Sequence, residues 1–299
     1  MGLRHIHVYE MPEESQNFSF QLYEVQGKTI RGKTYPHKTE LPHRHSYYEI
    51  CIFANGAGRH EIDFQTYPIA SYSIHFLTPG QVHLISSEKD YHGYLMVFKR
   101  EFYPVTLENK DILFELPFFN NPSISPILEL NKEDFSQIQT LIDNIKSELV
   151  NYNEYTPEIL RSYLHIFLLK CKNYFDLYRP EISGNDDIAY KTASKFRYLV
   201  EQHFSSLHFV SEYADMMALT SPKLNKTVNR MTGYNASDVI TNRIVLEAKR
   251  LLTYTELTNK EVAFRLGYED PSYFSRIFKN KTGDTPSEFK NKMNKKYQK

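Results

Sequence analysis

Two histidines and a glutamate lie within seven residues of one another in this 299-residue chain, and a third histidine follows in the first third of the sequence. His43, His45 and Glu49 are all odd-numbered, so in one extended strand they would share a face with Tyr47. His83 follows a turn sequence further along the chain. Such a set can bind a divalent metal ion, contact an organic ligand directly, or form hydrogen bonds within the fold. The residue types alone leave these three alternatives open.

We expect this cluster to line a pocket for a small molecule, and we assign it no metal ion, no cofactor and no catalytic residue. The pocket candidates are Arg31, His43, His45, Tyr47, Glu49 and His83. The chain has 23 Tyr and 20 Phe, which suit sugars and aromatic acids alike, although most of them belong in a core. The sequence therefore does not decide whether the ligand is a sugar or a small acid, or whether there is a ligand at all.

A second group of residues, near the C-terminus, has the pattern of a DNA-reading motif. Residues 259–283 contain a short helix pattern, Gly267 at a turn, and a second helix pattern that Asp270 and Pro271 would begin. A short helix, a tight turn and a second helix with a polar, basic outer face can place side chains in a major groove.

The same pattern occurs earlier in the chain. Ala214 and Ala263 are 49 residues apart, and Gly233 and Gly283 are 50 residues apart. The small alanine lets the two helices of each unit cross closely, and the glycine ends the second helix. One long helix expected over 237–253 would join the two units rigidly. Two recognition helices about 34 Å apart could then enter successive major grooves on one face of B-DNA.

The DNA-contact candidates are the residues that the two recognition helices would turn outward. A single helix with a polar outer face usually has that face because it is exposed to solvent. Here the same explanation would have to apply to two helices that also have caps and turns at matching positions. The candidates are Lys223, Asn225, Lys226, Asn229, Arg230, Ser272, Tyr273, Ser275, Arg276 and Lys279.

The charge distribution supports a division into two parts. Residues 1–186 hold 17 Lys/Arg and 24 Asp/Glu, whereas residues 187–299 hold 19 Lys/Arg and 12 Asp/Glu, giving net charges of −7 and +7. A basic half favours a polyanionic partner. No apolar run is long enough to span a membrane. Cys51 and Cys171 are far apart, which fits a reducing compartment, so we expect the protein in the cytoplasm.

The remaining elements follow from periodicity. Short aromatic and β-branched runs over 18–100 predict a β-sandwich or small barrel, and the prolines of 102–130 predict an irregular segment. Two helices are expected over 132–178, because apolar residues recur at helical spacing. Their apolar stripes could either cap the sheet or form a dimer interface. Residues 179–187 have the composition of a linker.

Residues 190–289 resemble the DNA-binding domain of AraC-type transcription regulators. The matching residues are Ala214, Ser221, Leu224, Gly233, Arg243, Ala248, Leu251-Leu252, Val262-Ala263, Gly267-Tyr268, Ser272-Tyr273-Phe274, Arg276, Phe278-Lys279, Gly283 and Thr285-Pro286. Family members usually have an aromatic residue at the position of Val228 and often arginine at that of Lys226, so the first unit departs from the pattern. The resemblance implies base contacts from Asn225, Lys226, Ser272, Tyr273 and Arg276.

The histidine cluster is similar to the paired motifs of cupin barrels. The first motif corresponds to His43–Glu49 with Gly56 after it, and the second to Pro79–His83. The glycine and asparagine that usually frame the second motif are absent here, where Ala70-Ser71 and Ser87 stand near those places. AraC-type regulators often carry a cupin-like sensor domain ahead of the DNA-binding domain, so the order of the two resemblances agrees.

Together these features predict an α+β chain with two domains. Residues 1–180 are expected to form a cupin-like domain for ligand sensing and dimerisation, with a β-barrel at about 18–100 and helices at about 132–178. Residues 188–299 are expected to form an all-α domain with two helix-turn-helix units.

The predicted function is a sequence-specific transcription regulator, an activator, that is not an enzyme and is controlled by a small molecule in the barrel. Its expected partners are double-stranded operator DNA, an effector such as a sugar, a second copy of the chain, and RNA polymerase, with no membrane. The main alternative is a metal-dependent cupin enzyme with a helical appendage. A non-specific architectural DNA binder is a weaker one, because the acidic N-terminal half would be repelled by DNA.

Overall fold

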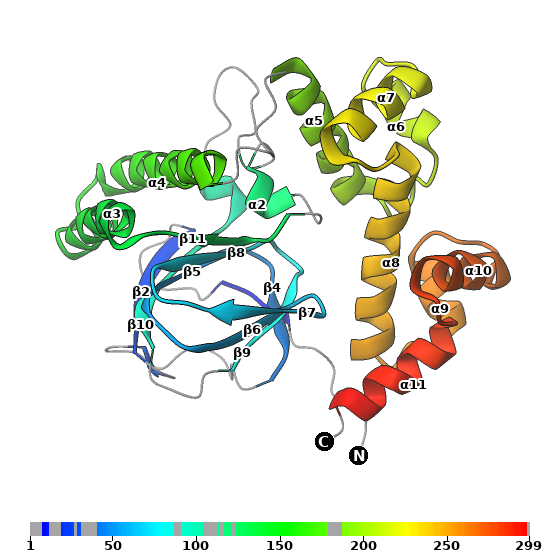
Figure 1. Ribbon diagram of the computed structural model, residues 1–299, viewed down its shortest axis with the longest axis horizontal. Coiled ribbons are helices and arrows are strands. Elements are labelled where there is room, and N and C mark those ends of the chain that lie inside the picture. Colours follow the sequence, from blue (N-terminus) through cyan, green and yellow to red (C-terminus); the bar gives the residue numbers. More distant parts are fainter. Residues whose placement is uncertain are drawn as a thin grey trace. The chain divides into compact units, whose positions relative to one another are not determined.

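The computed structural model describes residues 8–11, 19–26, 29–30, 41–86, 91–103, 113, 116–120, 124–178 and 187–297. The chain forms two compact units, which contain His7–Ser183 and Gly184–Lys299 (Figure 1). We refer to them as the barrel unit and the helical unit. Within the described ranges, every helix is too short or too polar to cross a membrane.

Two β-sheets form the barrel unit. The five-stranded sheet has the order β1 (Val8–Tyr9), β4 (His43–His45), β9 (Val82–Ser86), β6 (Gly58–Ile62) and β7 (Gln65–Ile69). The six-stranded sheet has the order β11 (Ile127–Glu129), β8 (Ser73–Leu77), β5 (Tyr48–Asn55), β10 (His92–Phe98), β2 (Phe20–Gln26) and β3 (Thr29–Ile30). Apolar residues of both sheets share one interior cluster, so the sheets face each other across a common core.

The six-stranded sheet is buried on both faces, and alternation along its strands separates two cores. In β5, Cys51 and Phe53 belong to the barrel interior, whereas Ile50 and Ile52 belong to a second core that includes the helices. A strand that is buried on both sides appears in the sequence as a continuous apolar run. This explains why the run at 47–53 lacks polar residues other than Glu49.

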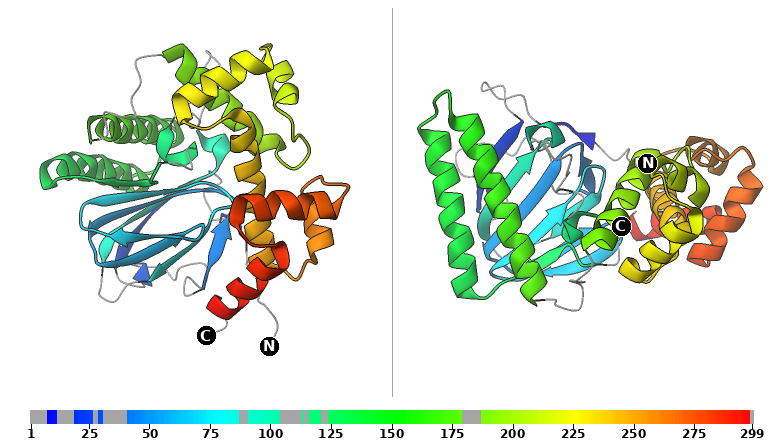
Figure 2. Two further views of the ribbon diagram at one scale, coloured as in Figure 1. Left: turned by 45° about the vertical axis from the view of Figure 1, so that its right-hand side comes forward. Right: turned by 90° about the horizontal axis from the view of Figure 1, so that it is seen from above.

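Helices α3 (Lys132–Val150) and α4 (Thr156–Tyr178) lie side by side across the outer face of this sheet (Figure 2). The apolar stripe of α3, which includes Phe135, Ile138 and Ile142, packs into the same core as Ile50 and Ile52 of the sheet. The stripe therefore caps the sheet, which was one of the two roles that the sequence left open.

Three local predictions for the barrel unit need correction. First, 102–130 is not wholly irregular, because it contains α2 (Pro117–Asn120) and the edge strand β11. Second, within the predicted β region the run of residues 58–64 is not a strand to its end: β6 ends at Ile62, since Asp63 and Phe64 have φ values of 45° and 73° and form a tight turn. Third, His43–Cys51 is not one strand: Ser46 and Tyr47 form a bend, and β4 and β5 belong to different sheets.

The helical unit consists of helices in the described residues. They are α5 (Asp187–His203), α6 (Val210–Met216), α7 (Ser221–Thr232), α8 (Ala236–Tyr254), α9 (Asn259–Arg265), α10 (Pro271–Thr282) and α11 (Pro286–Tyr297). The pairs α6–α7 and α9–α10 are the two helix-turn-helix units, joined by the long α8 as predicted (Figure 1). One continuous apolar core connects all seven helices.

The ends of the recognition helices α7 and α10 have matching caps. Thr220 and Asp270 are the N-caps, and their side chains accept hydrogen bonds from backbone N–H groups of the first turn. Gly233 and Gly283 end the helices in the left-handed conformation, with φ of 75° and 82°. Each of these boundaries agrees with the helix signals in the sequence.

Candidate nucleic-acid interface and candidate ligand site

The two recognition helices expose the same positions. Residues 221–230 and 271–280 have an identical order of buried, half-buried and exposed side chains. In each helix two residues four apart, Leu224 with Val228 and Phe274 with Phe278, are fully or almost fully buried. Both helices therefore present one solvent-facing surface of the same shape, set by the same inward contacts.

The outward surface of α10 carries polar, aromatic and basic groups. Tyr273 is 49% exposed, and the Arg276 guanidinium lies 5.7 Å from its ring centroid. Ser272 and Lys279 are exposed as well, whereas Ser275 is half-buried and its hydroxyl donates to the Pro271 carbonyl at 2.8 Å. A solvent-facing tyrosine that contacts an arginine gives this surface both an aromatic group and a forked donor for base edges.

On α7 the structure separates the five candidates into two kinds. Lys223, Lys226, Asn229 and Arg230 are exposed. Asn225 is half-buried, and its Oδ1 accepts a hydrogen bond from the Ala236 backbone N–H at 2.9 Å. The side chain of Asn225 therefore helps to cap α8, and only its amide N–H groups remain as potential donors to DNA.

The structure explains why a valine can replace an aromatic residue at position 228. Val228 corresponds to Phe278 in the repeat, but in the first unit the aromatic bulk comes from Tyr213 of α6, where the second unit has Val262. The Tyr213 ring lies 5.6 Å from that of Phe196 in a T-shaped arrangement, and both rings are fully buried. The volume missing from one helix of the unit is thus supplied by its neighbours.

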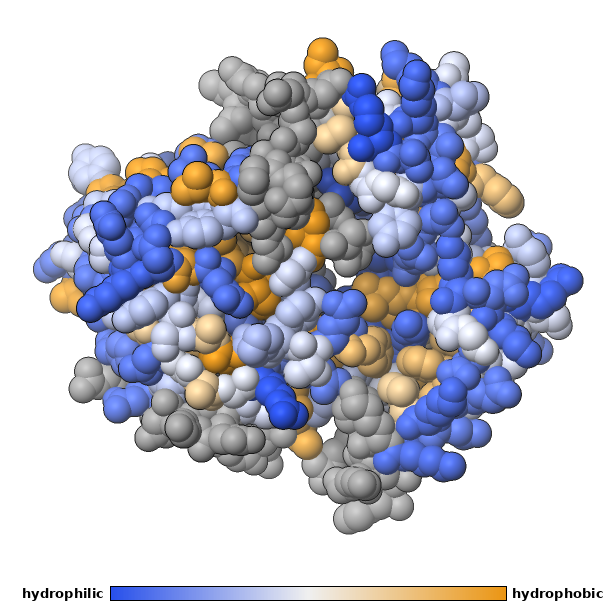
Figure 3. Space-filling view, viewed as in Figure 1, coloured by the Kyte–Doolittle hydropathy of each residue, from blue (hydrophilic) through white to orange (hydrophobic). Residues whose placement is uncertain are grey.

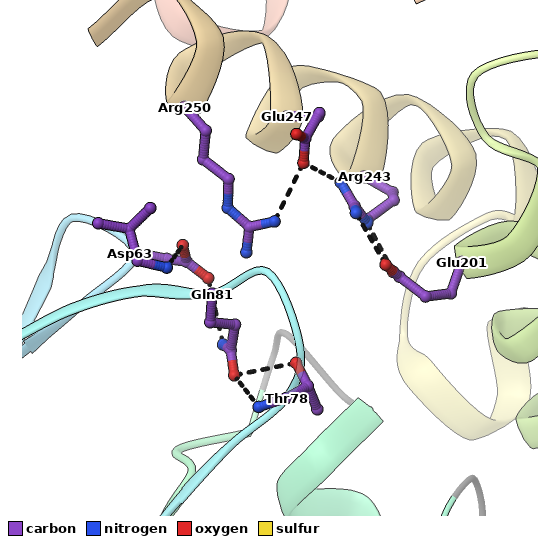
Figure 4. A network of polar contacts seen from close by, with 8 residues as sticks. Asp63, Thr78, Gln81, Glu201, Arg243, Glu247 and Arg250 are labelled. Carbon is purple, nitrogen blue, oxygen red and sulfur yellow. Dashed lines mark hydrogen bonds and ion pairs between the residues drawn. The ribbon is translucent and has the colours of Figure 1, made fainter. Parts of the chain in front are cut away.

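Polar contacts tie α8 to α5 within the helical unit (Figure 4). Arg243 donates two hydrogen bonds to the carboxylate of Glu201, at 2.6 and 2.8 Å, and a third to Glu247 at 3.1 Å. Its guanidinium also lies 3.8 Å from the ring centroid of Phe204. This arginine matches the family pattern, and its contacts give it a structural role between two helices.

A second connection joins the loop after α5 to the turn of the other helix-turn-helix unit. The His208 ring stacks on Tyr268 with centroids 4.4 Å apart, and His208 Nε2 lies 2.9 Å from the Leu266 carbonyl oxygen. The Tyr268 centroid is in turn 6.1 Å from that of Tyr273 on α10. The two helix-turn-helix units thus contact each other directly, in addition to being joined by α8.

In the barrel unit, the structure brings the predicted histidines and glutamate together. His43 and His83 are directly opposite each other on β4 and β9. His45 Nε2 lies 2.9 Å from His83 Nε2 and 3.2 Å from Glu49 Oε2, and His83 Nε2 lies 3.7 Å from Glu49 Oε1. All four side chains are at most 3% exposed. They converge although β4 and β5 belong to different sheets, because the bend at 46–47 keeps Glu49 facing the interior.

The turn that leads into β9 is held by side-chain hydrogen bonds, which Figure 4 also shows. Gln81 Oε1 accepts hydrogen bonds from the backbone N–H and the hydroxyl of Thr78, and its Nε2 donates to Asp63 Oδ2 at 3.1 Å. Asp63 Oδ1 also accepts from the Val82 N–H. These contacts fix the start of β9, and therefore the position of His83.

Two further histidines belong to this cluster and were not among the predicted residues. His60 Nε2 lies 3.0 Å from His83 Nδ1, and His60 Nδ1 lies 3.0 Å from His75 Nδ1. His75 Nε2 in turn lies 3.3 Å from Ser73 Oγ. Both rings are fully buried. Each histidine stands in a predicted strand, but the sequence does not show that β6 pairs with β9 or that these faces point inward.

Burial keeps much of this cluster uncharged. It lowers the pKa of His75 to about 3, and it lowers the pKa of His60 well below its usual value, an effect that the charges of His75 and His43 increase. Burial also lowers the pKa of His43, although the hydrogen bond to a backbone carbonyl opposes the change. It raises the pKa of Glu49 to about 8. Neutral imidazole is the form that binds metal ions or accepts hydrogen bonds.

Tyr47 and Arg31 complete the predicted pocket residues. Tyr47 is 2% exposed, its ring centroid lies 4.6 Å from that of His45, and burial raises the pKa of its phenol. Arg31 lies outside the described residues.

Comparison with known proteins gives two matches to family models. Residues 30–167 match the AraC-like ligand binding domain, and residues 213–292 match a helix-turn-helix domain. The chain is 21% identical to the HTH-type transcriptional activator RhaR of Enterobacter sp. (strain 638), over 87% of this chain and 90% of that protein. It is 24% identical to RhaR of Mannheimia succiniciproducens, over 85% and 88%. An uncharacterized HTH-type transcriptional regulator of Bacillus subtilis, YfiF, is 23% identical over 85% and 80%.

Proposed function

The chain belongs to the AraC-type transcription regulators, and we propose that both of its recognition helices bind one operator under the control of a ligand in the barrel. It is a DNA-binding regulator with a ligand-binding domain, and its curated relatives are transcription regulators. That kinship does not support the alternative of a metal-dependent enzyme with a helical appendage.

The observation that carries the proposal is the repeated surface of α7 and α10. Both helices begin at a residue whose side chain caps the first turn, end at a left-handed glycine, and have the same order of exposed residues. α8 and the contact between His208 and Tyr268 join the two units within one core. A fixed spacing between two recognition helices suits the regular spacing of major grooves along one face of DNA.

The chemistry of the two surfaces differs, and we assign them different parts in recognition. On α10, Arg276 can fork onto guanine, and Tyr273 can contact an apolar base edge. On α7, Lys226 offers a flexible point charge. We therefore propose that Ser272, Tyr273 and Arg276 contact base edges. Lys226 and the Asn225 amide would add the base preference that is specific to this protein. The other candidates would bind phosphates. These are Lys223, Asn229, Arg230, Ser275 and Lys279.

We propose that the barrel interior holds a small polar effector and that the protein acts as a dimer that activates transcription together with RNA polymerase. The buried polar cluster around His45 and Glu49 would supply the contacts to such a ligand, whether a sugar, an acid or an ion. Apolar side chains are exposed on the outer surface of α4, including Ile166 and Leu169, and hydrophobic residues lie among hydrophilic ones there (Figure 3). Two related regulators bear the name activator.

Fluorescence anisotropy with labelled duplexes tests the DNA proposal. Fragments of the DNA upstream of the protein's own gene are compared with a shuffled duplex of the same length and composition, at several salt concentrations. We expect tighter binding to a native fragment, and an affinity that falls with salt by a slope of about −0.9 per phosphate contact. Equal affinity for native and shuffled duplexes would contradict sequence-specific regulation.

A further inference from the structure

We propose that His208 is a positioning residue that fixes the angle between the two helix-turn-helix units and thereby restricts the protein to operators with one spacing between the two bound grooves. This rests on the proposed DNA-reading function and deepens it, because it names what sets the required spacing. His208 lies in the loop between α5 and α6, and its side chain reaches the turn between α9 and α10.

The loop of the first unit and the turn of the second are packed against each other. A Cβ atom at Gly267 would lie 2.3 Å from the Ser205 carbonyl oxygen and 3.2 Å from His208 Nε2. The two backbones therefore approach more closely than any side chain at position 267 would allow. A shift of either segment changes the relation between the two units.

His208 makes two contacts with this turn. Its Nε2 lies 2.9 Å from the Leu266 carbonyl oxygen, which can only accept, so Nε2 carries the proton and donates. Leu266 is the C-cap of α9 and is 1% exposed, so the bond satisfies a buried carbonyl at a helix end. The imidazole also stacks on Tyr268, with centroids 4.4 Å apart and planes at 24°. Together the two contacts fix both the position and the orientation of the turn.

The position of His208 is in turn fixed by the first unit. Its backbone N–H donates to Glu212 Oε2, in the first turn of α6, at 2.9 Å. The carbonyl of the preceding Leu207 accepts from the Tyr213 hydroxyl at 2.9 Å, and the Leu207 N–H donates to the His203 carbonyl of α5 at 2.8 Å. The imidazole therefore extends from a loop that both α5 and α6 hold in place.

The internal repeat indicates that an imidazole is not needed here for the fold of one unit. At the 49-residue offset, His208 corresponds to Leu257. Each precedes the N-cap of the first helix of its unit, and in both units a glutamate accepts a hydrogen bond from the N-cap N–H. Leu257 is partly buried against the core of the helical unit. An apolar residue thus serves the same local position, and the contact with the other unit accounts for the histidine.

The stack continues to the proposed base-reading surface. The Tyr268 centroid lies 6.1 Å from that of Tyr273, whose centroid lies 5.7 Å from the Arg276 guanidinium. One base pair inserted between two bound grooves rotates them relative to each other by about 35° and separates them by about 3.4 Å more. If the joint at His208 cannot rotate, only one recognition helix can bind its bases on such DNA.

The test is a selection from random DNA duplexes. Full-length wild type and His208→Leu, which introduces the residue of the repeat, each bind the library, and the bound DNA is sequenced. We expect wild type to enrich two motifs at one spacing of about one helical turn. His208→Leu should enrich the same motifs at several spacings. A single, identical spacing for both proteins would overturn the proposal.

Fluorescence anisotropy then measures the effect on the enriched wild-type duplex and on the same duplex with one base pair inserted between the motifs. The insertion should weaken wild-type binding about 100-fold or more, because the two helices no longer bind together, and His208→Leu binding about tenfold or less. A substitution that only destabilises the unit would weaken binding to both duplexes equally, and that unchanged ratio would also overturn the proposal.

His203→Leu is the matched control, because it makes the same exchange on the last turn of α5, outside the stack. It should keep the wild-type ratio. If far-UV circular dichroism shows that His208→Leu does not fold, His208→Phe takes its place, since it keeps a ring beside Tyr268 and loses the hydrogen bond. Its ratio should also fall below that of wild type, and an unchanged ratio would overturn the proposal.

The selection keeps this proposal distinct from the one on which it rests. A wild type that enriches no motif would contradict the DNA-reading function itself. Enrichment of two motifs whose spacing does not change in the His208 variants would overturn only the role of His208.

Discussion

Ala218 and Gly267 occupy the same turn of the two helix-turn-helix units, and both have positive φ, 53° and 80°. At Gly267 a Cβ atom would lie 2.3 Å from the Ser205 carbonyl oxygen, so both the backbone angle and the space require glycine. Ala218 is exposed and adopts the angle with a side chain present. The first unit therefore contains a turn that is strained relative to its counterpart.

The substitutions Ala218→Gly and Gly267→Ala should have opposite effects on the stability of the two turns. Ala218→Gly removes a left-handed strain of about 1–2 kcal/mol and stabilises the unfolded chain by about 0.5–1 kcal/mol through its greater entropy, so we expect a net stabilisation of up to about 1.5 kcal/mol. Gly267→Ala introduces the strain and the clash, and should cost about 2 kcal/mol or more. Hydrogen exchange of the full-length protein measures both, over residues 210–232 and 259–282. Faster exchange in the first unit of Ala218→Gly would refute the strain argument.

The second prediction concerns Arg276 and Lys279 on α10. If Arg276 forks onto a base, Arg276→Ala should cost about 1–3 kcal/mol of DNA-binding free energy and relax the preference at one operator position. If Lys279 contacts a phosphate, Lys279→Ala should weaken binding on all sequences and reduce the salt slope by about 1. Affinity measured on an operator library distinguishes the two. A uniform loss on every sequence for Arg276→Ala would make Arg276 a phosphate contact instead.

The helical unit could be predicted from sequence because its signals are local. Caps such as Thr220 and Asp270, the glycine ends and the i, i+4 apolar pairs all act within one or two turns of helix. The contact of His208 with Tyr268 could not be predicted, since it joins residues 60 apart through tertiary packing.

In the barrel unit, local sequence signals predict less of the structure. Alternation along one strand predicted that His43, His45 and Glu49 share a face, and His83 was added because it follows a turn further along the chain. In the structure these residues come together through a bend between two sheets. Inclusion of His60 depends on the register of β6 with β9, in which Ile62 lies opposite His83. Pairing between strands that are distant in sequence is set by packing and not by any local residue pattern.

A third prediction follows from the low pKa of His75. The folded-state pKa is about 3, below the usual 6.5, so between these values the unfolded chain binds a proton that the folded chain does not. The stability contributed by neutral His75 is complete above pH 6.5 and is lost as the pH falls toward 3. Calorimetric unfolding in EDTA from pH 7 to 4 should show a shallower pH dependence for His75→Gln than for wild type. Glu49 contributes to both proteins and cancels in the comparison, and parallel curves would contradict the prediction.

The fourth prediction concerns the outer surface of α4. Ile166 and Leu169 are 42% and 41% exposed although their neighbours on the inner side are buried in the core with the six-stranded sheet. If this surface forms the dimer, Ile166→Asp places a charge in an apolar interface, where it is costly to desolvate. Light scattering after size exclusion should then give a dimer for wild type and a monomer for Ile166→Asp at the same concentration. Thr140→Asp, an exposed change on α3, should leave the dimer intact, and a dimer that survives Ile166→Asp would exclude this face as the interface.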